Sequence, residues 1–150
     1  MHTLVKGLIA GAAGTCALNI VTYLDMLVRA RPASGTPKET ASRLAEAAGL
    51  SLGGDEERAG NREEAIGALL GYATGAGVAV CYGLLAGRRR PPCPAGVAAL
   101  AALAMLGSNG PMTVLGVTDP RKWSAADWIS DVVPHAAYGV VAYAAYELMR

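Results

Sequence analysis

The sequence predicts an all-α protein that crosses a membrane as a bundle of four helices, and three features predict it. Hydrophobic residues make up 53% of the chain and charged residues only 17%. The charges gather in a few segments, so the rest of the chain forms long neutral runs. Residues 65–87 carry no charge, and small residues recur there at every fourth position: Gly67, Gly71, Gly75, Ala79, Gly83 and Gly87. Together these features indicate helices that pack in lipid.

The glycine ridge of residues 65–87 suits a membrane helix better than a soluble one. In water each glycine costs a helix roughly 1 kcal/mol relative to alanine. In lipid, helices associate through close approach of their backbones across small residues, so the same ridge favours packing. We therefore expect a glycine zipper that packs helices within the chain or between copies.

Residues 4–28 form the first predicted span, because 25 residues at about 1.5 Å each can cross a hydrocarbon core about 30 Å thick. Gly7 and Gly11 begin a second line of small residues, which suits this helix to lie against the glycine ridge. Asp25 can pair with an arginine one turn later. A cleaved signal is the alternative to a first span, but the apolar run continues well beyond Cys16, where a lipoprotein-type cleavage would fall.

Residues 29–64 form a polar connection that is rich in charge. Residues 36–39, Thr-Pro-Lys-Glu, have the pattern of a capping box with proline at the first helical position, and they start a short amphipathic helix that ends at Gly49. This helix would lie along the interface or fold onto the bundle, or it would dock a partner. Farther on, Asn61 with a glutamate three residues later predicts the cap of the glycine-ridge helix.

Residues 94–117 form the third predicted span, and its interior is uneven. The segment 107–111, Gly-Ser-Asn-Gly-Pro, predicts a break. Either the helix breaks at membrane depth, with Ser108 and Asn109 facing protein or water, or a short helix ends here in an interfacial loop.

Residues 126–149 form the fourth predicted span, and its first turns are polar. Ser124 with Asp127 three residues later predicts a capping box at its start. Two tryptophans flank that cap, as in the aromatic belt of a membrane interface. Asp131 and His135 follow on one face of the helix, with a proline between them. An ion pair, or a neutral imidazole oriented by the aspartate, would let these groups lie inside a bundle.

The candidate polar site consists of Asp131 and His135, with Asp25 or Asn109 completing a polar path. Aspartate and histidine on one helix face are what a proton relay needs, because imidazole titrates near neutral pH. A structural histidine satisfied by its aspartate is the alternative. The pair lies within two turns of Trp128, close to the expected interface, so the structural interpretation is favoured.

Composition and spacing argue against several other functions. The net charge of +1, without arginines interleaved with aromatics, argues against a nucleic-acid surface. Cys16, Cys81 and Cys93 lack metal-ligand spacing, and two histidines are too few for an ordinary metal site. A lone Asp/His pair predicts no enzyme, because Ser130 adjoins the aspartate on the wrong side of the helix and no other nucleophile is suitably spaced. No cofactor is expected.

Several segments resemble a known group of membrane proteins. Residues 116–120 (Gly-Val-Thr-Asp-Pro), Trp123, residues 128–135 and residues 138–139 resemble uncharacterised small membrane proteins of actinobacteria, and residues 17–37 are similar to the same group. The resemblance implies four helices and a plasma-membrane location, but no activity. The Gly-Leu-Ile-Ala-Gly opening and a late histidine are also similar to the YagU type of inner-membrane protein, which is linked to acid tolerance.

The sequence therefore predicts one transmembrane domain over residues 1–150. The leading hypothesis is a non-enzymatic scaffold, or an oligomer-forming or accessory subunit. Its expected partners are the lipid bilayer and either a second copy or another membrane protein. The alternative is a small transporter or a proton- or ion-conducting pore that uses Asp131 and His135.

Overall fold

A computed structural model describes residues 2–86, 89 and 91–150, and the chain is all-helical over these residues, without a strand. The elements are α1 (Thr3–Arg29), α2 (Thr36–Ala47), α3 (Glu56–Ala86), α4 (Cys93–Val114), the short 3-10 helix η1 (Pro120–Lys122) and α5 (Ala125–Leu148). The predicted all-α class is confirmed, and α2 is the short helix expected in the first connection.

Three helices, α1, α3 and α4, are long and apolar enough to cross a membrane, judged by length and composition. The sequence predicts four. The fourth long helix, α5, carries Asp127, Asp131 and Glu147, which interrupt its apolar sequence.

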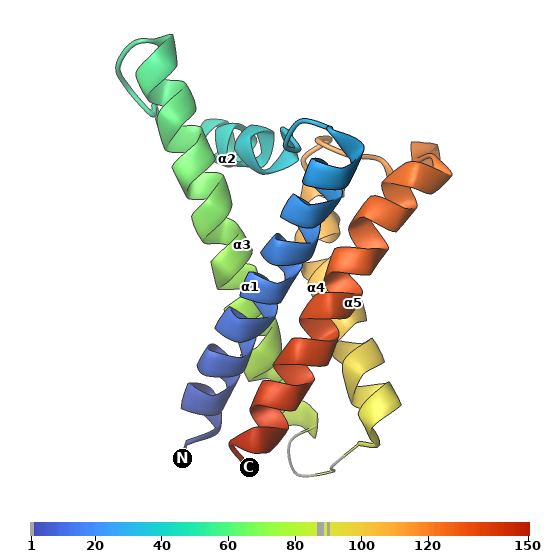
Figure 1. The fold of residues 1–150 in the computed structure, drawn as a ribbon. Helices are drawn as coiled ribbons and strands as arrows, with labels where there is room; N and C mark the ends of the chain where they lie inside the picture. The colour runs from blue at the N-terminus through green and yellow to red at the C-terminus, as the bar shows by residue number, and fades with distance from the viewer. Residues whose placement is uncertain (1, 87–88, 90) are drawn as a thin grey trace.

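The four long helices form a bundle (Figure 1). In it, α1 packs against α3 and α5, and α4 packs against α5 and α3. Both ends of the described chain lie at one end of the bundle, whereas α2 lies across the opposite end and packs on α3 (Figure 1). The polar connection therefore leaves the bundle after α1, crosses its end and returns as α3.

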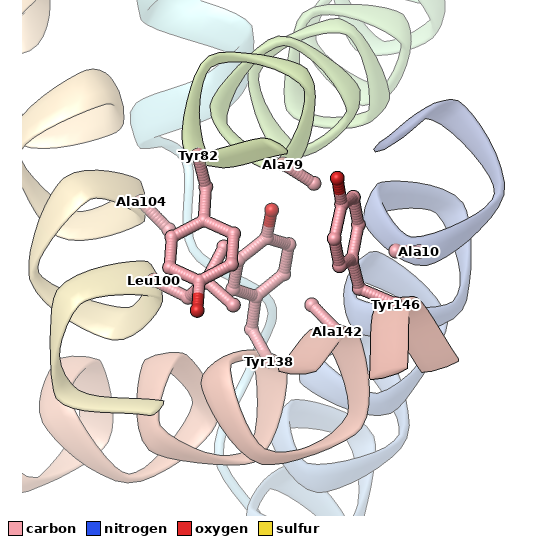
Figure 2. Close-up of a cluster of buried hydrophobic side chains, with 8 residues drawn as sticks. All are labelled: Ala10, Ala79, Tyr82, Leu100, Ala104, Tyr138, Ala142 and Tyr146. Carbon is pink, nitrogen blue, oxygen red and sulfur yellow. The ribbon is translucent and has the colours of Figure 1, made fainter. Parts of the chain in front are cut away.

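The buried core consists of small residues, one leucine and tyrosines. Figure 2 shows its eight side chains: Ala10, Ala79, Tyr82, Leu100, Ala104, Tyr138, Ala142 and Tyr146. The Tyr138 hydroxyl donates to the Gly75 carbonyl oxygen at 2.6 Å, and the Tyr146 hydroxyl donates to the Gly83 carbonyl oxygen at 3.5 Å. Because the chain has no phenylalanine, tyrosine rings fill the space beside the small residues, and backbone carbonyls satisfy two of the three hydroxyls.

Glycines of α1 let this helix approach α3 closely. A Cβ on Gly7 would lie 2.6 Å from the Val80 Cα, and a Cβ on Gly11 would lie 2.5 Å from the Ala76 Cα. A side chain at either position would collide with backbone, which cannot move aside. The small-residue line of the first helix therefore lies against the glycine-ridge helix.

The glycine ridge of α3 winds around the helix instead of facing one neighbour. Gly67 faces α2, where its Cβ would lie 2.6 Å from the Pro37 carbonyl oxygen, whereas Gly83 faces α5. A Cβ on Gly71 would meet nothing within 4 Å, and Gly87 lies outside the described residues. The helical period explains the winding, because four residues advance about 400° and each step therefore turns the ridge by about 40°.

The predicted break at residues 107–111 is wrong, because α4 continues through it to Val114. Pro111 lies in the last turns of α4, where it removes only one backbone donor. The Ser108 side chain follows the helix, since its hydroxyl donates to the Ala104 carbonyl oxygen at 3.0 Å. One continuous helix thus replaces both predicted alternatives, the break at membrane depth and the interfacial loop.

One predicted capping box and one predicted helix start are also wrong. α2 begins at Thr36, as predicted, but the capping box expected there does not form, because the cap position belongs to Gly35. α3 starts at Glu56 instead of after Asn61, and Asp55 caps it by accepting from the Arg58 N–H at 2.9 Å. A cap predicted beside an apolar run is misplaced when the helix continues beyond the run into a charged segment.

The capping box predicted at the start of α5 is confirmed. The Ser124 hydroxyl accepts from the Asp127 N–H at 3.2 Å, and the Asp127 carboxylate accepts from the Ser124 N–H at 2.9 Å. This reciprocal pair satisfies two amides at the start of α5.

Candidate functional site

Four polar side chains meet where α4 packs against α5, and we call them the α4–α5 polar cluster: Ser108, Asn109, Asp131 and His135. α4 supplies the first two from adjacent positions. α5 supplies the other two at i+4 spacing, so both lie on one face of that helix. His135 is buried, with 8% of its surface exposed, and the other three are half-buried.

The His135 imidazole is held at both of its nitrogens. Nδ1 lies 2.7 Å from the Asp131 carbonyl oxygen and 3.5 Å from Asp131 Oδ1. Both of these neighbours accept hydrogen bonds, so Nδ1 is assigned the proton and donates. Nε2 lies 3.3 Å from the Ser108 hydroxyl oxygen, a group that can donate or accept.

The Asp131 carboxylate connects the two helices. Its Oδ2 accepts a hydrogen bond from Asn109 Nδ2 on α4 at 2.9 Å, while its Oδ1 faces the His135 imidazole on its own helix. A carboxylate with partners at both oxygens can be tolerated inside a bundle, because desolvation is offset by these bonds.

Each of the two helices carries a proline beside the cluster, Pro111 in α4 and Pro134 in α5. A proline has no N–H, so neither can donate to the carbonyl four residues earlier, that of Gly107 or Ser130. Each of these two carbonyls therefore lacks its usual helical donor.

The structure brings together three of the four predicted polar residues but leaves out Asp25. This carboxylate belongs to an α1–α5 latch, which consists of Asp25, Arg29, Arg31 and Ser130. Arg31 Nε lies 2.5 Å from Asp25 Oδ2 and Arg29 Nη1 lies 3.4 Å from Asp25 Oδ1, so the predicted pairing with Arg29 is confirmed. Arg29 Nη1 also donates to the Ser130 hydroxyl at 2.7 Å, which ties the end of α1 to α5.

Ser108 is the partner of His135 that sequence reasoning missed. The sequence places it in a predicted break, where the direction of a side chain cannot be derived. A continuous helix would put Ser108 beside Asn109 on α4, but only the packing of α4 on α5 shows that it reaches the imidazole.

Ser108, His135 and Asp131 are connected in the order of a Ser-His-Asp catalytic triad, but their surroundings do not suit acyl transfer. The Ser108 hydroxyl also donates to the Ala104 and Met105 carbonyl oxygens, at 3.0 and 3.2 Å. Ser108 lies within α4, where backbone N–H groups bond to preceding carbonyls and are not free to form an oxyanion hole.

The turn between α4 and α5 is polar and aromatic. The rings of Trp123 and Trp128 contact each other, with 4.9 Å between their centroids. Arg121 donates two side-chain hydrogen bonds to Asp119, at 2.9 and 3.0 Å. These bonds hold the pKa of Asp119 below its ordinary value, because they favour the ionised carboxylate.

Outside the α4–α5 polar cluster, the described residues provide weaker candidates for a functional site. A cavity of about 220 Å³ lies between α2 and the start of α3, and Glu46 and Glu63 contribute to its lining. The three cysteines of the chain are free and exposed. Among residues 2–86, 89 and 91–150, no three His, Cys, Asp or Glu side chains gather in a way that could hold a metal ion.

Comparison with protein families, with curated proteins and with solved structures finds no match to this chain. The resemblance to small membrane proteins of actinobacteria stays a prediction.

Proposed function

We propose that the chain is a multi-pass integral protein of the plasma membrane, with α1, α3, α4 and α5 as its spans. The distribution of side-chain size carries this proposal. The core holds alanines, tyrosines and one leucine. Large aliphatic side chains on every long helix lie outside it, among them Leu8, Leu69, Leu106 and Val140, each between 52% and 68% exposed.

Such a distribution favours lipid over water. Full burial of one Leu, Ile or Val side chain is worth about 1.5–3 kcal/mol in water, so a soluble protein would forgo that gain on all four helices. In hydrocarbon the outward side chains lose nothing, and helices associate through the close contacts that small residues allow.

The inward direction of its polar groups supports α5 as the fourth span. Asp131 and His135 lie in the interface with α4, where Ser108 and Asn109 are their partners. Polar side chains that are satisfied within the bundle do not prevent a helix from crossing a bilayer.

Within the membrane we propose a structural role, as a scaffold or an accessory subunit without catalysis. Gly7, Gly11, Gly75 and Gly83 make their close contacts inside the chain. A membrane-protein partner or a second copy would therefore contact mainly the outward aliphatic surface.

Cysteine labelling in opened native membranes tests the embedding. Cys16 lies in the middle of α1, Cys93 begins α4, and both are exposed on the protein. In single-cysteine variants, a charged maleimide should label Cys93 and spare Cys16 until a denaturing detergent is added, because alkylation needs a thiolate in contact with water. Labelling of Cys16 at the rate of Cys93 in untreated membranes would contradict the proposal.

A second candidate function is proton or ion transfer through the bundle. The α4–α5 polar cluster favours it, because Asp131 and His135 adjoin further hydrogen-bonding groups on a second helix. Such groups in a membrane interior commonly mark a path for protons or ions.

Flux into liposomes that contain a pH-sensitive dye tests this second function. Asp131→Asn and His135→Gln should each abolish proton flux while the protein stays equally abundant. Asp127→Asn, which changes an exposed carboxylate on the same helix, is the matched control and should keep the wild-type rate. Wild-type flux in both cluster variants would exclude transfer through the cluster.

A further inference from the structure

The donors and acceptors around His135 match its neutral form. Nδ1–H donates to the Asp131 carbonyl oxygen at 2.7 Å. Nε2 then has a free lone pair, and the Ser108 hydroxyl at 3.3 Å can donate to it. In this state every polar atom of the imidazole has a partner.

The same atoms also match the doubly protonated form. Nε2–H can donate to the Ser108 oxygen, and the Ser108 proton can turn to the Ala104 carbonyl oxygen at 3.0 Å. The positive charge then faces Asp131 Oδ1, 3.5 Å from Nδ1. Rotation of one hydroxyl is enough to convert the hydrogen bonds of one state into those of the other.

We propose that the α4–α5 polar cluster is a proton-binding site. His135 takes up the proton, Asp131 is its counter-ion, and Ser108 is a positioning residue whose hydroxyl changes from donor to acceptor. The inference rests on the proposed membrane bundle, because the packing of α4 on α5 brings these groups together.

The charged groups of the neighbouring helices leave Asp131 as the carboxylate that contacts the imidazole. α4 has no Asp, Glu, Lys, Arg or His between its bounds, and α3 has none from residue 65 to its end. α1 brings Arg29, which is paired with Asp25 and bonded to Ser130. On α5, Asp127 is exposed and bonded to the cap residue of that helix.

Nitrogen-15 NMR of the full chain in lipid nanodiscs tests the proposal. His2→Gln leaves His135 as the only histidine. Well above pH 6.5, where an ordinary histidine titrates, we expect the Nδ1–H tautomer, although free imidazole side chains favour Nε2–H. On acidification both nitrogens should become protonated while the amide spectrum keeps its dispersion. An Nε2–H tautomer, or an Nε2 without a proton down to the pH of unfolding, would overturn the proposal.

Variants of Ser108 test its role in positioning. Ser108→Ala should lower the proton affinity of His135 by about three- to tenfold, because the hydrogen bond that the charged form loses is stronger than the one that the neutral form loses, and Ser108→Thr should restore it. Thr113→Ala is the control, since this exposed hydroxyl of α4 donates to the Asn109 carbonyl oxygen and not to the imidazole. Equal titration of Ser108→Ala and Thr113→Ala would remove Ser108 from the proposal. A failure of the bundle itself would appear differently, as loss of the dispersed amide spectrum.

Discussion

At the scale of single residues, position on the helix decides what a glycine does. Gly71 and Gly75 lie one turn apart on α3 in an apolar segment, yet their surroundings differ. A Cβ on Gly75 would meet the Thr15 hydroxyl and lie 3.2 Å from the Tyr138 ring, whereas a Cβ on Gly71 would meet nothing within 4 Å. Of these two glycines, only Gly75 is needed for the packing of the bundle.

Alanine substitutions at Gly75 and Gly71 distinguish the effect of helix packing on stability from the effect of helix propensity. Gly75→Ala should destabilise the protein by about 1–3 kcal/mol, because the added methyl group overfills a packed site. Gly71→Ala should be neutral or stabilise the protein by up to about 1 kcal/mol, because its methyl group meets open space and alanine is the better residue inside a helix. Reversible unfolding in mixed micelles with increasing dodecyl sulfate measures both, and equal losses would contradict the packing of α3 described above.

At the scale of elements, the ends of the helices depend on side chains that the apolar pattern does not reveal. α5 begins where expected, because Ser124 and Asp127 bond to each other's amides. α3 begins earlier than expected, so Asn61 lies within its second turn instead of at its start. The charged first turns of α3 project beyond α2, at the end of the bundle opposite the chain ends (Figure 1).

Alanine substitutions at a real and a rejected cap test this difference. Ser124→Ala should cost about 0.5–2 kcal/mol, because it leaves an amide at the start of α5 without its acceptor. Asn61→Ala should be neutral or slightly stabilising, because alanine is the better residue inside a helix. Unfolding measurements on both variants check this, and a larger loss for Asn61→Ala would return the start of α3 to the predicted place.

At the scale of the whole molecule, the bundle places both chain ends together, opposite α2 and η1 (Figure 1). In a membrane, an even number of spans likewise places both chain ends on the same side. The position of the chain ends therefore bears on whether α5 crosses the bilayer with α1, α3 and α4.

Reporters that are active on one side of a membrane check this topology. Fusions at the two chain ends should report the same side, and a reporter inserted between α2 and α3 should report the opposite side. If the two ends report opposite sides, α5 does not span and the number of spans is three.

Part of the candidate site could be predicted from the sequence. Asp131 and His135 are one turn apart on a helix, so their contact follows from the helical period. The contacts of Asn109 and Ser108 depend on the continuity of α4, whereas the glycines and proline of residues 107–111 predict a break there. Pro111 is tolerated there because it lies close to the end of α4, where few backbone bonds remain to be lost.

The sequence by itself determined the all-helical class, the long apolar helices and the polar face of α5, because these depend on periodicity and composition along one segment. Only the tertiary structure decided which glycines are covered, that Arg29 reaches Ser130 in the α1–α5 latch, and that Ser108 meets His135. Those contacts join residues far apart in the chain, and they depend on the rotation of each helix about its axis. A repeat of four residues on a helix of 3.6 residues per turn leaves that rotation undetermined until the neighbouring helices are in place.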